Sequence, residues 1–534
     1  MNTSNRTTSF FLFFLVICFI ILSTSITTTK AAPIPKKSKD DDNDNNKQSL
    51  ISANIGAVGP LDVGASATIN SDNDVNTSGG VLLVLLVGFN SHNVQAKSAT
   101  GERVLVLLDD EADKALYSQF FKTLEDRKYT FSYKTASDPK VDLLAFNERA
   151  FDHVINFAPK TKNYDNKVNP AAFIDFVNRG GNILLAASSG LSETIRDFAR
   201  EFDIEFDDRD TSVIDHFNYD VSDSDGKHTL LVLDDKKGGF TNNSMILSQE
   251  TLEGPPILYK GIGHKIGTVP LLTRVAWITS NTAYSYETKE DQIADQDPFI
   301  LGSDISLVSA LQARNNARVT FVGSLELFQD SSLNSPVQKI NSKESHPKSG
   351  NQAFVDDLTK WTFQEKGVLK VTARRHHLEG EEEPLETYRI KDNIVYSIEI
   401  SEYTNEKWQP FNGTDVQLEV IMLDPYIRRT LTPLEIQPQN HHNSRIFESH
   451  LQLPDVYGVF TFKVNYKRPG YSYIIDMTTV AVRPFRHNEY PRFILAAYPY
   501  YAGAASMSVG FLVFSTVWIF NKDRSATKED KKNN

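Results

Sequence analysis

The sequence predicts a doubly wound α/β domain, then an antiparallel β-sandwich, then one C-terminal transmembrane helix. From residue 101 apolar runs alternate with amphipathic segments, which is typical of parallel strands joined by helices. After Gly367 the apolar period becomes two, as in strands that bury one face. Between Arg492 and Lys522 no charged residue occurs, and a stretch of that length can cross a bilayer.

The N-terminus has the layout of a secretory signal peptide. Arg6 precedes an apolar core from Phe10 to Leu22, and small residues then lead to Ala31 and Ala32. The core is shorter than the roughly 20 apolar residues that a spanning helix needs, so we expect cleavage near residue 32, with an uncleaved anchor as the alternative. Residues 33–100, which include an acidic run at 40–46, read as a low-complexity linker.

Composition excludes several classes of protein. The only cysteine, Cys18, lies in the predicted signal peptide, so the mature chain has no thiol for a disulfide, a nucleophile or a thiolate metal site. The net charge of −12 argues against a nucleic-acid partner.

The α/β domain is expected over 101–229. ERVLVLLDD at 102–110 reads as a buried parallel strand, and the next segment as a helix with Leu116, Phe120 and Leu124 on one face. Two further strands, YTFSYKT and FDHVINFAP, follow.

The next helix has clear ends: Asn169 can cap it, Pro170 is its first residue and Gly180 ends it. GNILLAASSG is then another strand, and 191–202 a helix. An irregular α/β continuation is expected over 230–367, ending in an amphipathic helix at 351–367. The β-sandwich is expected over 368–490, the span over 495–520 and a tail over 521–534.

Candidate catalytic residues gather where strands end, which is where ligands bind in open α/β sheets. They are Asp109, Asp110, Ser188 and Ser189. The serine turn lacks the G-x-S-x-G glycines of a nucleophile elbow, so we expect a serine to cap the next helix instead. The acidic pair is expected to cap a helix or solvate a loop.

Histidines give no stronger signal. Asp215–His216 has no identifiable third member of a catalytic triad. The pairs His376–His377 and His441–His442 invite a metal hypothesis, but adjacent strand residues point to opposite faces and cannot easily chelate one ion. We therefore expect no catalytic residue, no metal site and no cofactor.

The span and its flanks predict a type I topology. A cleaved signal places the body outside the cytosol, and the excess of Lys and Arg after the span agrees with a cytosolic tail. Ala502, Ser506 and Gly510 recur every four residues and form a small-residue face on which another helix could dock.

Two kinds of modification or targeting signal are present. Asn76, Asn242 and Asn412 begin Asn-x-Ser/Thr sequons in polar stretches. Lys531 and Lys532 match the dilysine pattern that retrieves residents of the endoplasmic reticulum; a simple positive-inside role is the alternative.

Several stretches resemble one known family, in order along the chain from about Gly101. They are LVLLDD (105–110), VIDHFNYD (213–220), LQARNNARV (311–319), LPDVYGVFTFKVNY (453–466) and AYPYYA (497–502). The family is the 48 kDa subunit of the oligosaccharyltransferase complex of the endoplasmic reticulum, which N-glycosylates nascent proteins. The linker at 33–100 departs from the family, whose members start soon after the signal.

The resemblance implies a non-catalytic accessory subunit in the endoplasmic-reticulum membrane, needed for assembly and for handling of the lipid-linked donor. It implies an amidotransferase-like α/β fold and, as partners, a catalytic multispanning subunit with ribophorin-like and DAD-like subunits. Two other classes stay open from the residues alone: a membrane-anchored lumenal hydrolase and a cargo transport receptor.

Overall fold

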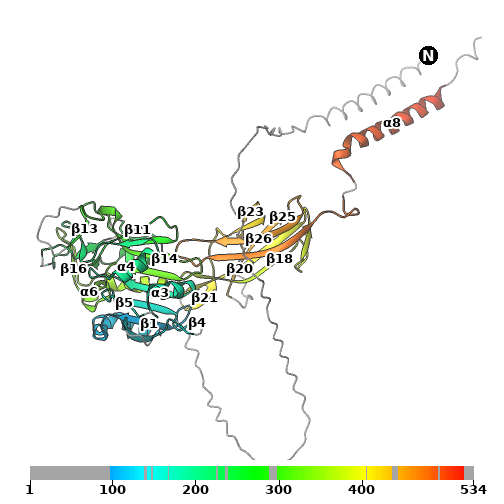
Figure 1. The fold of residues 1–534 in the computed structure, drawn as a ribbon. Helices are drawn as coiled ribbons and strands as arrows, with labels where there is room; N and C mark the ends of the chain where they lie inside the picture. Colours follow the sequence, from blue (N-terminus) through cyan, green and yellow to red (C-terminus); the bar gives the residue numbers. More distant parts are fainter. Residues whose placement is uncertain are drawn as a thin grey trace, which may run out of the picture. The chain divides into compact units, whose positions relative to one another are not determined.

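The computed structural model describes residues 97–521, apart from 138–140, 146–147, 166, 224–225, 235–237, 288–296, 405, 436–442 and 491–492. The predicted signal peptide, nearly all of the linker and nearly all of the tail lie outside these residues. So do several residues singled out above: Asn76, His441, His442, Lys531 and Lys532. The described chain forms a mixed-sheet domain, a two-sheet domain and one apolar C-terminal helix (Figure 1).

Five parallel strands make up one half of the large sheet, in the order β2-β1-β5-β6-β15. Both faces of these strands are covered, which is why β1 reads as the continuous apolar run RVLVLL. The bounds are β1 (Arg103–Leu108), β2 (Thr130–Thr135), β5 (His153–Phe157), β6 (Asn182–Ala186) and β15 (Arg318–Val322).

The other half of this nine-stranded sheet is antiparallel, unlike the wholly parallel sheet that we predicted. The order continues β15-β14-β11-β7, and β12 also pairs with β14, off this path. Five residues link β14 to β15, and so short a connection can join only antiparallel strands. The 230–367 segment thus supplies strands to the same sheet. The bounds are β7 (Ile204–Phe206), β11 (His264–Ile266), β12 (Leu272–Trp277) and β14 (Ser306–Gln312).

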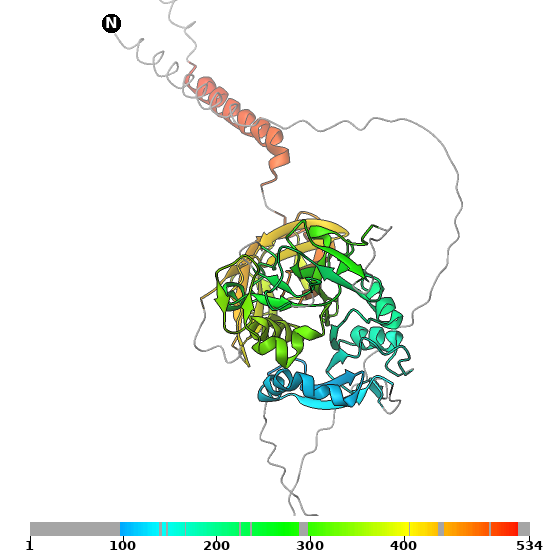
Figure 2. The same ribbon diagram turned by 90° about the vertical axis from the view of Figure 1, so that its left-hand side faces the viewer.

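Helices cover both faces of the sheet. On one face α2 and α7 pack in a core with Val104, Val106 and Leu108, and on the other α3 and α4 pack with Leu105 and Leu107. Alternate residues of β1 therefore divide between the two cores. In Figure 2 the yellow-green α7 and the teal α3 and α4 lie on opposite sides of the sheet. The bounds are α2 (Ser118–Asp126), α3 (Pro170–Asn178), α4 (Glu193–Arg200) and α7 (Asn351–Thr362).

The first predicted helix begins as a 3-10 helix, η1 (Glu111–Tyr117), and continues as α2. Phe120 and Leu124 are buried as predicted, but Leu116 is 49% exposed and Tyr117 takes the core position. A 3-10 helix has three residues per turn, so a spacing of four no longer keeps Leu116 on the buried face.

The ends of the other helices match the predictions in part. Asn169 caps α3 by accepting a hydrogen bond from the backbone N–H of Ala172 at 2.8 Å, and Pro170 is the first residue, as predicted. The predicted end of α7 at Gly367 is wrong. The helix stops at Thr362, because Gln364 has a φ of 59° and this left-handed conformation ends it.

Short elements complete the mixed-sheet domain. Four two-stranded ladders pair β3 with β4, β8 with β13, β9 with β10 and β16 with β17. The strand bounds are β3 (Leu144–Ala145), β4 (Glu148–Arg149), β8 (Thr211–Ile214), β9 (Leu231–Leu233), β10 (Ile257–Tyr259), β13 (Tyr284–Glu287), β16 (Val337–Gln338) and β17 (Ser345–His346). The helix bounds are α5 (Gln249–Glu253), η3 (Gly302–Asp304), η4 (Glu326–Phe328) and α6 (Asp330–Asn334).

The two-sheet domain follows α7. One sheet has the order β18-β20-β25-β24 with β21 beside β20, and the other the order β19-β27-β26-β22-β23. Every second residue of β20 from Ile394 to Ile400 is fully buried, in one core with alternate residues of β26 from the other sheet. The bounds are β18 (Val368–Leu378), β19 (Thr387–Arg389), β20 (Asn393–Thr404), β21 (Lys407–Pro410), β22 (Gln417–Met422), β23 (Asp424–Thr430), β24 (Thr432–Pro433), β25 (Arg445–Gln452), β26 (Gly458–Tyr466) and β27 (Ile474–Arg483).

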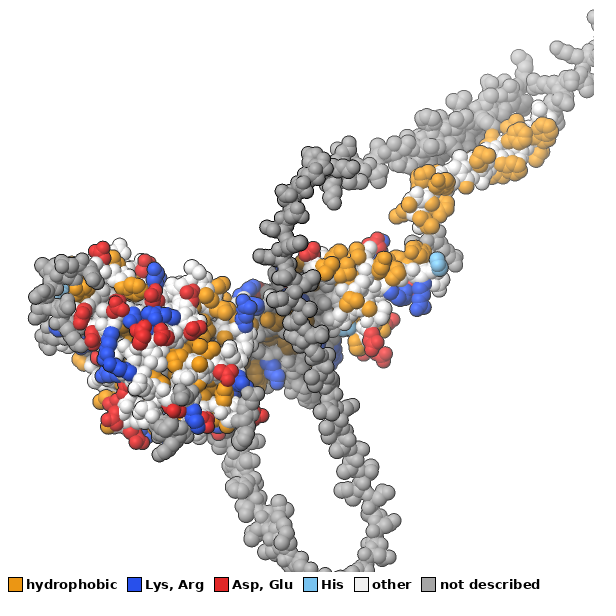
Figure 3. Space-filling model, viewed as in Figure 1, with side chains coloured by type: hydrophobic (Ala, Val, Ile, Leu, Met, Phe, Trp, Pro, Cys, Tyr) orange, Lys and Arg blue, Asp and Glu red, His pale blue; other side chains and the backbone are white. Residues whose placement is uncertain are grey.

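The chain then enters η5 (Leu495–Ala497) and α8 (Tyr498–Phe520). Together they form an apolar helix of 26 residues with a mean hydropathy of 1.7, long enough to cross a membrane. No residue of α8 is buried, and apolar side chains dominate its visible surface (Figure 3). A helix that is apolar all round and unburied in the protein is suited to lipid.

Candidate functional site

The acidic pair after β1 has structural roles. Asp109 accepts hydrogen bonds from the backbone N–H and the hydroxyl of Thr161, at 2.9 and 2.7 Å, and so ties the loop after β5 to the end of β1. Asp110 caps η1 by accepting from Ala112 N at 3.3 Å. The predicted capping and loop roles are therefore confirmed for these two carboxylates.

The serines after β6 do not cap α4, so that expectation is wrong. The cap position belongs to Ser192, whose side chain makes no capping hydrogen bond. Ser188 Oγ is buried and has no hydrogen-bond partner among the described residues, and neither serine has a hydrogen bond to a histidine. No nucleophile–base pair is formed at this strand end, where such a pair would need to lie within hydrogen-bond reach.

Asp215 and His216 form hydrogen bonds with different partners. Asp215 is buried and accepts from Phe217 N, Thr282 Oγ1 and Asn218 Nδ2, at 2.9, 2.9 and 2.7 Å. His216 instead meets His228, with 2.6 Å between their Nδ1 atoms. The carboxylate thus organises its own turn and does not orient the imidazole as a catalytic triad would.

The first histidine pair behaves as two separate side chains. His376 Nδ1 lies 2.7 Å from the hydroxyl of Tyr388, while His377 Nδ1 lies 2.9 Å from the carbonyl of Leu378. Within the described residues no three His, Cys, Asp or Glu side chains are grouped so that they could hold a metal ion.

The most elaborate polar site is the joint between the two domains, and Arg318 is its centre. The Arg318 side chain is fully buried and has no carboxylate partner among the described residues. It donates to the carbonyls of Trp361, Lys366 and Gly367 at 2.7–2.8 Å and to that of Gly470 at 3.3 Å. Its guanidinium also lies 4.7 Å from the Trp361 ring centroid, within cation–π range.

This arrangement fixes the charge of the joint. Burial lowers the pKa of Arg318 to about 9, which still leaves the guanidinium protonated at neutral pH. Main-chain carbonyls solvate the cation in place of water, and those carbonyls come from both domains. Arg318 therefore joins the end of α7 and the start of β18 to the 470 loop of the two-sheet domain.

Neighbouring residues of the same motif extend the joint. Asn316 exchanges two hydrogen bonds with the backbone of Tyr473, at 2.6 and 3.1 Å, and Gln312 Nε2 donates to the carbonyl of Tyr471 at 2.5 Å. Trp361 Nε1 donates to Gly470 O at 2.9 Å. Asn316 has a φ of 69°, a left-handed conformation that asparagine tolerates better than most residues.

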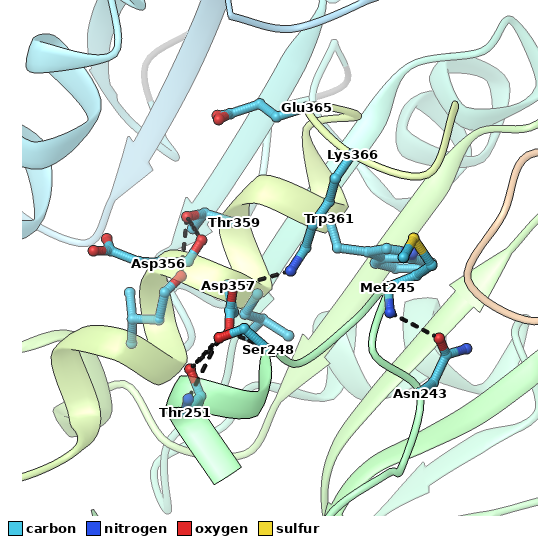
Figure 4. A network of polar contacts seen from close by, with 12 residues as sticks. Asn243, Met245, Ser248, Thr251, Asp356, Asp357, Thr359, Trp361, Glu365 and Lys366 are labelled. Atoms are coloured by element: carbon cyan, nitrogen blue, oxygen red, sulfur yellow. Dashed lines mark hydrogen bonds and ion pairs between the residues drawn. The ribbon is translucent and has the colours of Figure 1, made fainter. Parts of the chain in front are cut away.

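A second network anchors α7 within the mixed-sheet domain (Figure 4). Asp357 accepts from Ser248 N at 2.7 Å, from Thr251 Oγ1 at 2.6 Å and from Lys366 Nζ at 2.9 Å. The Lys366 ammonium and three hydrogen bonds hold the pKa of Asp357 below its usual range despite the burial. Since the Lys366 carbonyl accepts from Arg318, the two networks meet at this residue.

A buried ion pair secures the end of α7 to the edge of the sheet. Arg127 Nη1 lies 2.9 Å from Glu365 Oε1, and the Tyr129 hydroxyl donates to the same oxygen at 2.7 Å. Arg127 also donates to Thr359 Oγ1 at 2.7 Å. α7 is therefore held through Asp357 and Thr359 within the helix and through Glu365 just after its end.

The described sequons lie on exposed loops. Asn242 is exposed in the loop after β9, and Asn412 is exposed between β21 and β22, where its Oδ1 accepts from Arg445 Nη1 at 2.9 Å. On α8, Ala502, Ser506 and Gly510 are exposed, and the Ser506 hydroxyl is satisfied by Gly503 O at 2.8 Å.

Sequence patterns do not single out the joint. The two apolar segments around Asn315–Asn316 predict only a buried element, a turn and a strand. A signal was present, because Arg318 opens the otherwise uncharged strand RVTFV, and a charged residue at a buried strand position needs dedicated partners.

Comparison with known proteins gives consistent matches. The model of the OST48 N-terminal domain matches residues 95–365, and that of the OST48 middle domain matches 376–522. A relative from Arabidopsis thaliana, named as the 48 kDa subunit of dolichyl-diphosphooligosaccharide–protein glycosyltransferase, is 39% identical over 451 residues, which are 84% of this chain and 100% of the relative.

Two animal relatives carry the same name. The Danio rerio protein is 39% identical over 79% of this chain and 92% of its own length, and the Caenorhabditis elegans protein is 38% identical over 83% and 95%. A solved ThuA-like protein from Parabacteroides merdae aligns with 49% of this chain at 13% identity and a TM-score of 0.25.

Proposed function

Since this chain belongs to the OST48 family, whose curated members are named as the 48 kDa subunit of dolichyl-diphosphooligosaccharide–protein glycosyltransferase, we propose that it is an accessory subunit of that complex. The complex transfers an oligosaccharide from a dolichyl diphosphate carrier to asparagine. The observation that carries the proposal is the similarity of both domains and the C-terminal helix to relatives matched over 92–100% of their length.

We propose further that the subunit is non-catalytic. The support is local: Asp109 and Asp110 hold backbone, and Ser188 has no base within reach. Alanine at Asp109, Asp110, Ser188 and Ser189 should leave glycosylation of a reporter intact as long as the subunit folds. Loss of transfer by a normally assembled complex would contradict this. A hydrolase is the class that such a loss would favour.

The proposed localisation is the membrane of the endoplasmic reticulum, with a single type I span, the body in the lumen and the C-terminus in the cytosol. The apolar helix at Leu495–Phe520 supports the span. Lys531 and Lys532 are proposed as a retrieval address, and serine at both should expose a reporter to Golgi glycan processing.

The proposed partners are the catalytic multispanning subunit and the ribophorin-like and DAD-like subunits, with the Ala502, Ser506 and Gly510 face of α8 as one contact. Handling of the lipid-linked donor remains part of the proposal. Asn76, Asn242 and Asn412 are proposed as glycosylation sites, and the exposure of the last two supports this.

Purification through a tag on this chain in mild detergent tests the proposal. Co-isolation of a multispanning transferase, together with transfer activity in the eluate, is the expected result. Isolation of the chain with cargo glycoproteins alone would favour a transport receptor, and isolation of a lone active protein would favour a hydrolase.

A further inference from the structure

Asn412 is followed by Gly413 in the loop that joins β21 to β22. Its side chain is exposed, and its Oδ1 accepts a hydrogen bond from Arg445 Nη1 at 2.9 Å. Among the described residues, no hydrogen bond engages the backbone N–H of Gly413. The Gly413 nitrogen is therefore not held by a hydrogen bond among the described residues, and the Asn412 side chain is exposed to water.

Glycine is required at position 413 by packing. A Cβ added there would lie 2.3 Å from Phe411 Cε1 and 2.4 Å from Phe411 Cζ, and real Cβ atoms do not approach so closely. Phe411 cannot yield, because it is 2% exposed in the core and packs against Phe447, Tyr466 and Tyr471. The fold thus requires the glycine that follows Asn412.

We propose that Asn412 is a site of spontaneous deamidation, and that the glycan proposed for the same side chain protects it. Gly413 has no side chain to hinder its nitrogen, so this nitrogen can attack Cγ of Asn412. The new N–Cγ bond forms as the N–H proton passes to water, and the Cγ–Nδ2 bond then breaks as Nδ2 takes up a proton from water and leaves as ammonia, which closes a succinimide. Water then opens the ring at either carbonyl and yields aspartate or isoaspartate.

Arg445 assists the first step. When Gly413 N adds to Cγ, the negative charge develops on Oδ1, which already accepts a hydrogen bond from the guanidinium. The product carboxylate at 412 would then form an ion pair with the same arginine. The aspartate product is therefore stabilised where the asparagine stood.

A glycan on Asn412 would protect the side chain from deamidation because it changes the group that must leave. An N-linked glycan occupies Nδ2, so the departing amine would be a bulky glycosylamine and the amide would persist. This step depends on the glycosylation proposed above for Asn412. Isoaspartate, which forms without a glycan, would insert one more backbone carbon beside the buried Phe411 and so disturb the core that reaches Tyr471 at the domain joint.

The test compares two variants that each lose one sequon through an exposed residue: Thr414→Ala and Ser244→Ala. Each tagged chain is purified in its complex, incubated at neutral pH over days, and mapped by peptide mass spectrometry without enzymatic deglycosylation. In Thr414→Ala, Asn412 should gain about 1 Da, with isoaspartate as the main product. Asn242 in Ser244→Ala should deamidate roughly tenfold more slowly, because Asn243 has a side chain that hinders attack.

Equal rates at the two asparagines, or an intact Asn412 in Thr414→Ala, would overturn the inference. The wild-type map separates it from the glycosylation proposal, because it reports directly whether Asn412 carries a glycan. If the wild type has none, the glycosylation proposal fails, and the deamidation then predicted for the wild-type chain itself still tests this inference.

Discussion

At the scale of single residues, Arg318 shows how a costly group becomes a structural element. A buried guanidinium without an anion is unfavourable unless its donors are satisfied. Here carbonyls from the end of α7, from Gly367 and from Gly470 accept hydrogen bonds from Nη1 and Nη2, while Nε has no partner among the described residues. Gly470 has a φ of 86°, which brings its carbonyl into the joint and favours glycine there. The cation thus links backbone segments that are also joined by hydrogen bonds from Trp361 Nε1 to Gly470 O and from Ser472 N to Gly367 O.

We predict that Arg318→Met destabilises the protein by about 3 kcal/mol, because four carbonyls each lose a hydrogen bond from the buried guanidinium while the apolar stem is kept. Arg428→Met is the matched control, since Arg428 is 60% exposed and pairs with Glu419, and a surface pair is worth at most about 1 kcal/mol. Thermal unfolding of the detergent-purified chains measures both. Equal shifts in Tm would contradict the role assigned to Arg318.

The buried His153 makes the folding stability of the protein sensitive to acid. Burial lowers the pKa of His153 to about 4, and the neutral ring accepts from Asn182 Nδ2 at 3.2 Å while Nε2 lies 3.1 Å from Gly101 O. An unfolded histidine has a pKa of about 6.5, so below that pH the unfolded chain binds a proton that the folded chain refuses. Stability is therefore lost as pH falls, by about 2 kcal/mol at about pH 5.

His264 acts in the same direction, because burial lowers its pKa to about 3. His153→Asn should therefore flatten, and not abolish, the fall in Tm between neutral and mildly acidic buffer. A variant with the same pH dependence as the wild type would show that His153 does not titrate in this way.

Sequence patterns predicted the role of a residue when its hydrogen-bond partner lies nearby in the chain, and did not predict it when the partner lies far away. The cap at Asn169 was predictable because its partner is three residues away. The role of Arg318 was not, because Gly470 is 152 residues away and its identity as a partner depends on the docking of two domains. Ser188 shows the same limit, since a cap depends on where the helix begins and α4 begins at Glu193.

At the scale of elements, periodicity predicted most strands and helices, and departures have physical causes. Alternation identified β20 and β26, since a single shift of register would expose the core side chains. The antiparallel half of the large sheet escaped prediction because pairing direction depends on connection length and tertiary context. The division of the first helix into η1 and α2 escaped too, since over the seven residues of η1 too few apolar positions occur to distinguish a period of three from one of 3.6.

The apolar helix carries an element-scale prediction. Ser506 lies on the small-residue face with Ala502 and Gly510, and Ser508 lies on the opposite side of the same helix. Ser506→Leu should loosen the complex in native gels, because the larger side chain prevents close approach of a partner helix. Ser508→Leu makes the same chemical change and should be tolerated. Both hydroxyls bond to backbone of their own helix, so hydrogen bonding does not distinguish them. Equal effects would mean that the face is not an interface.

At the scale of the whole molecule, the mixed-sheet domain, the two-sheet domain and the apolar helix follow one another along the chain. If the subunit is an accessory, oligosaccharide transfer needs no residue in the described part of this chain, and the richest polar site in that part joins two domains. The joint links the mixed-sheet domain to the two-sheet domain, which is followed in the chain by the apolar helix. Sequence similarity identified the family, and physical patterns alone left three classes open.

The last prediction concerns the orientation of this assembly. Positive residues are more numerous after the span than before it, where Arg483, Arg486 and Arg492 lie, and such a bias retains the richer flank in the cytosol. Protease added to sealed microsomes should therefore remove a tag placed after residue 534 and leave the body intact. Detergent should then make exposed loops of the body accessible, including the one around Asn242. Charge reversal of the flanking arginines should not invert the protein, because the signal peptide commits the body first. Digestion of the body in sealed vesicles would contradict the type I topology and, with it, the proposed glycans on Asn242 and Asn412, since these require the lumen.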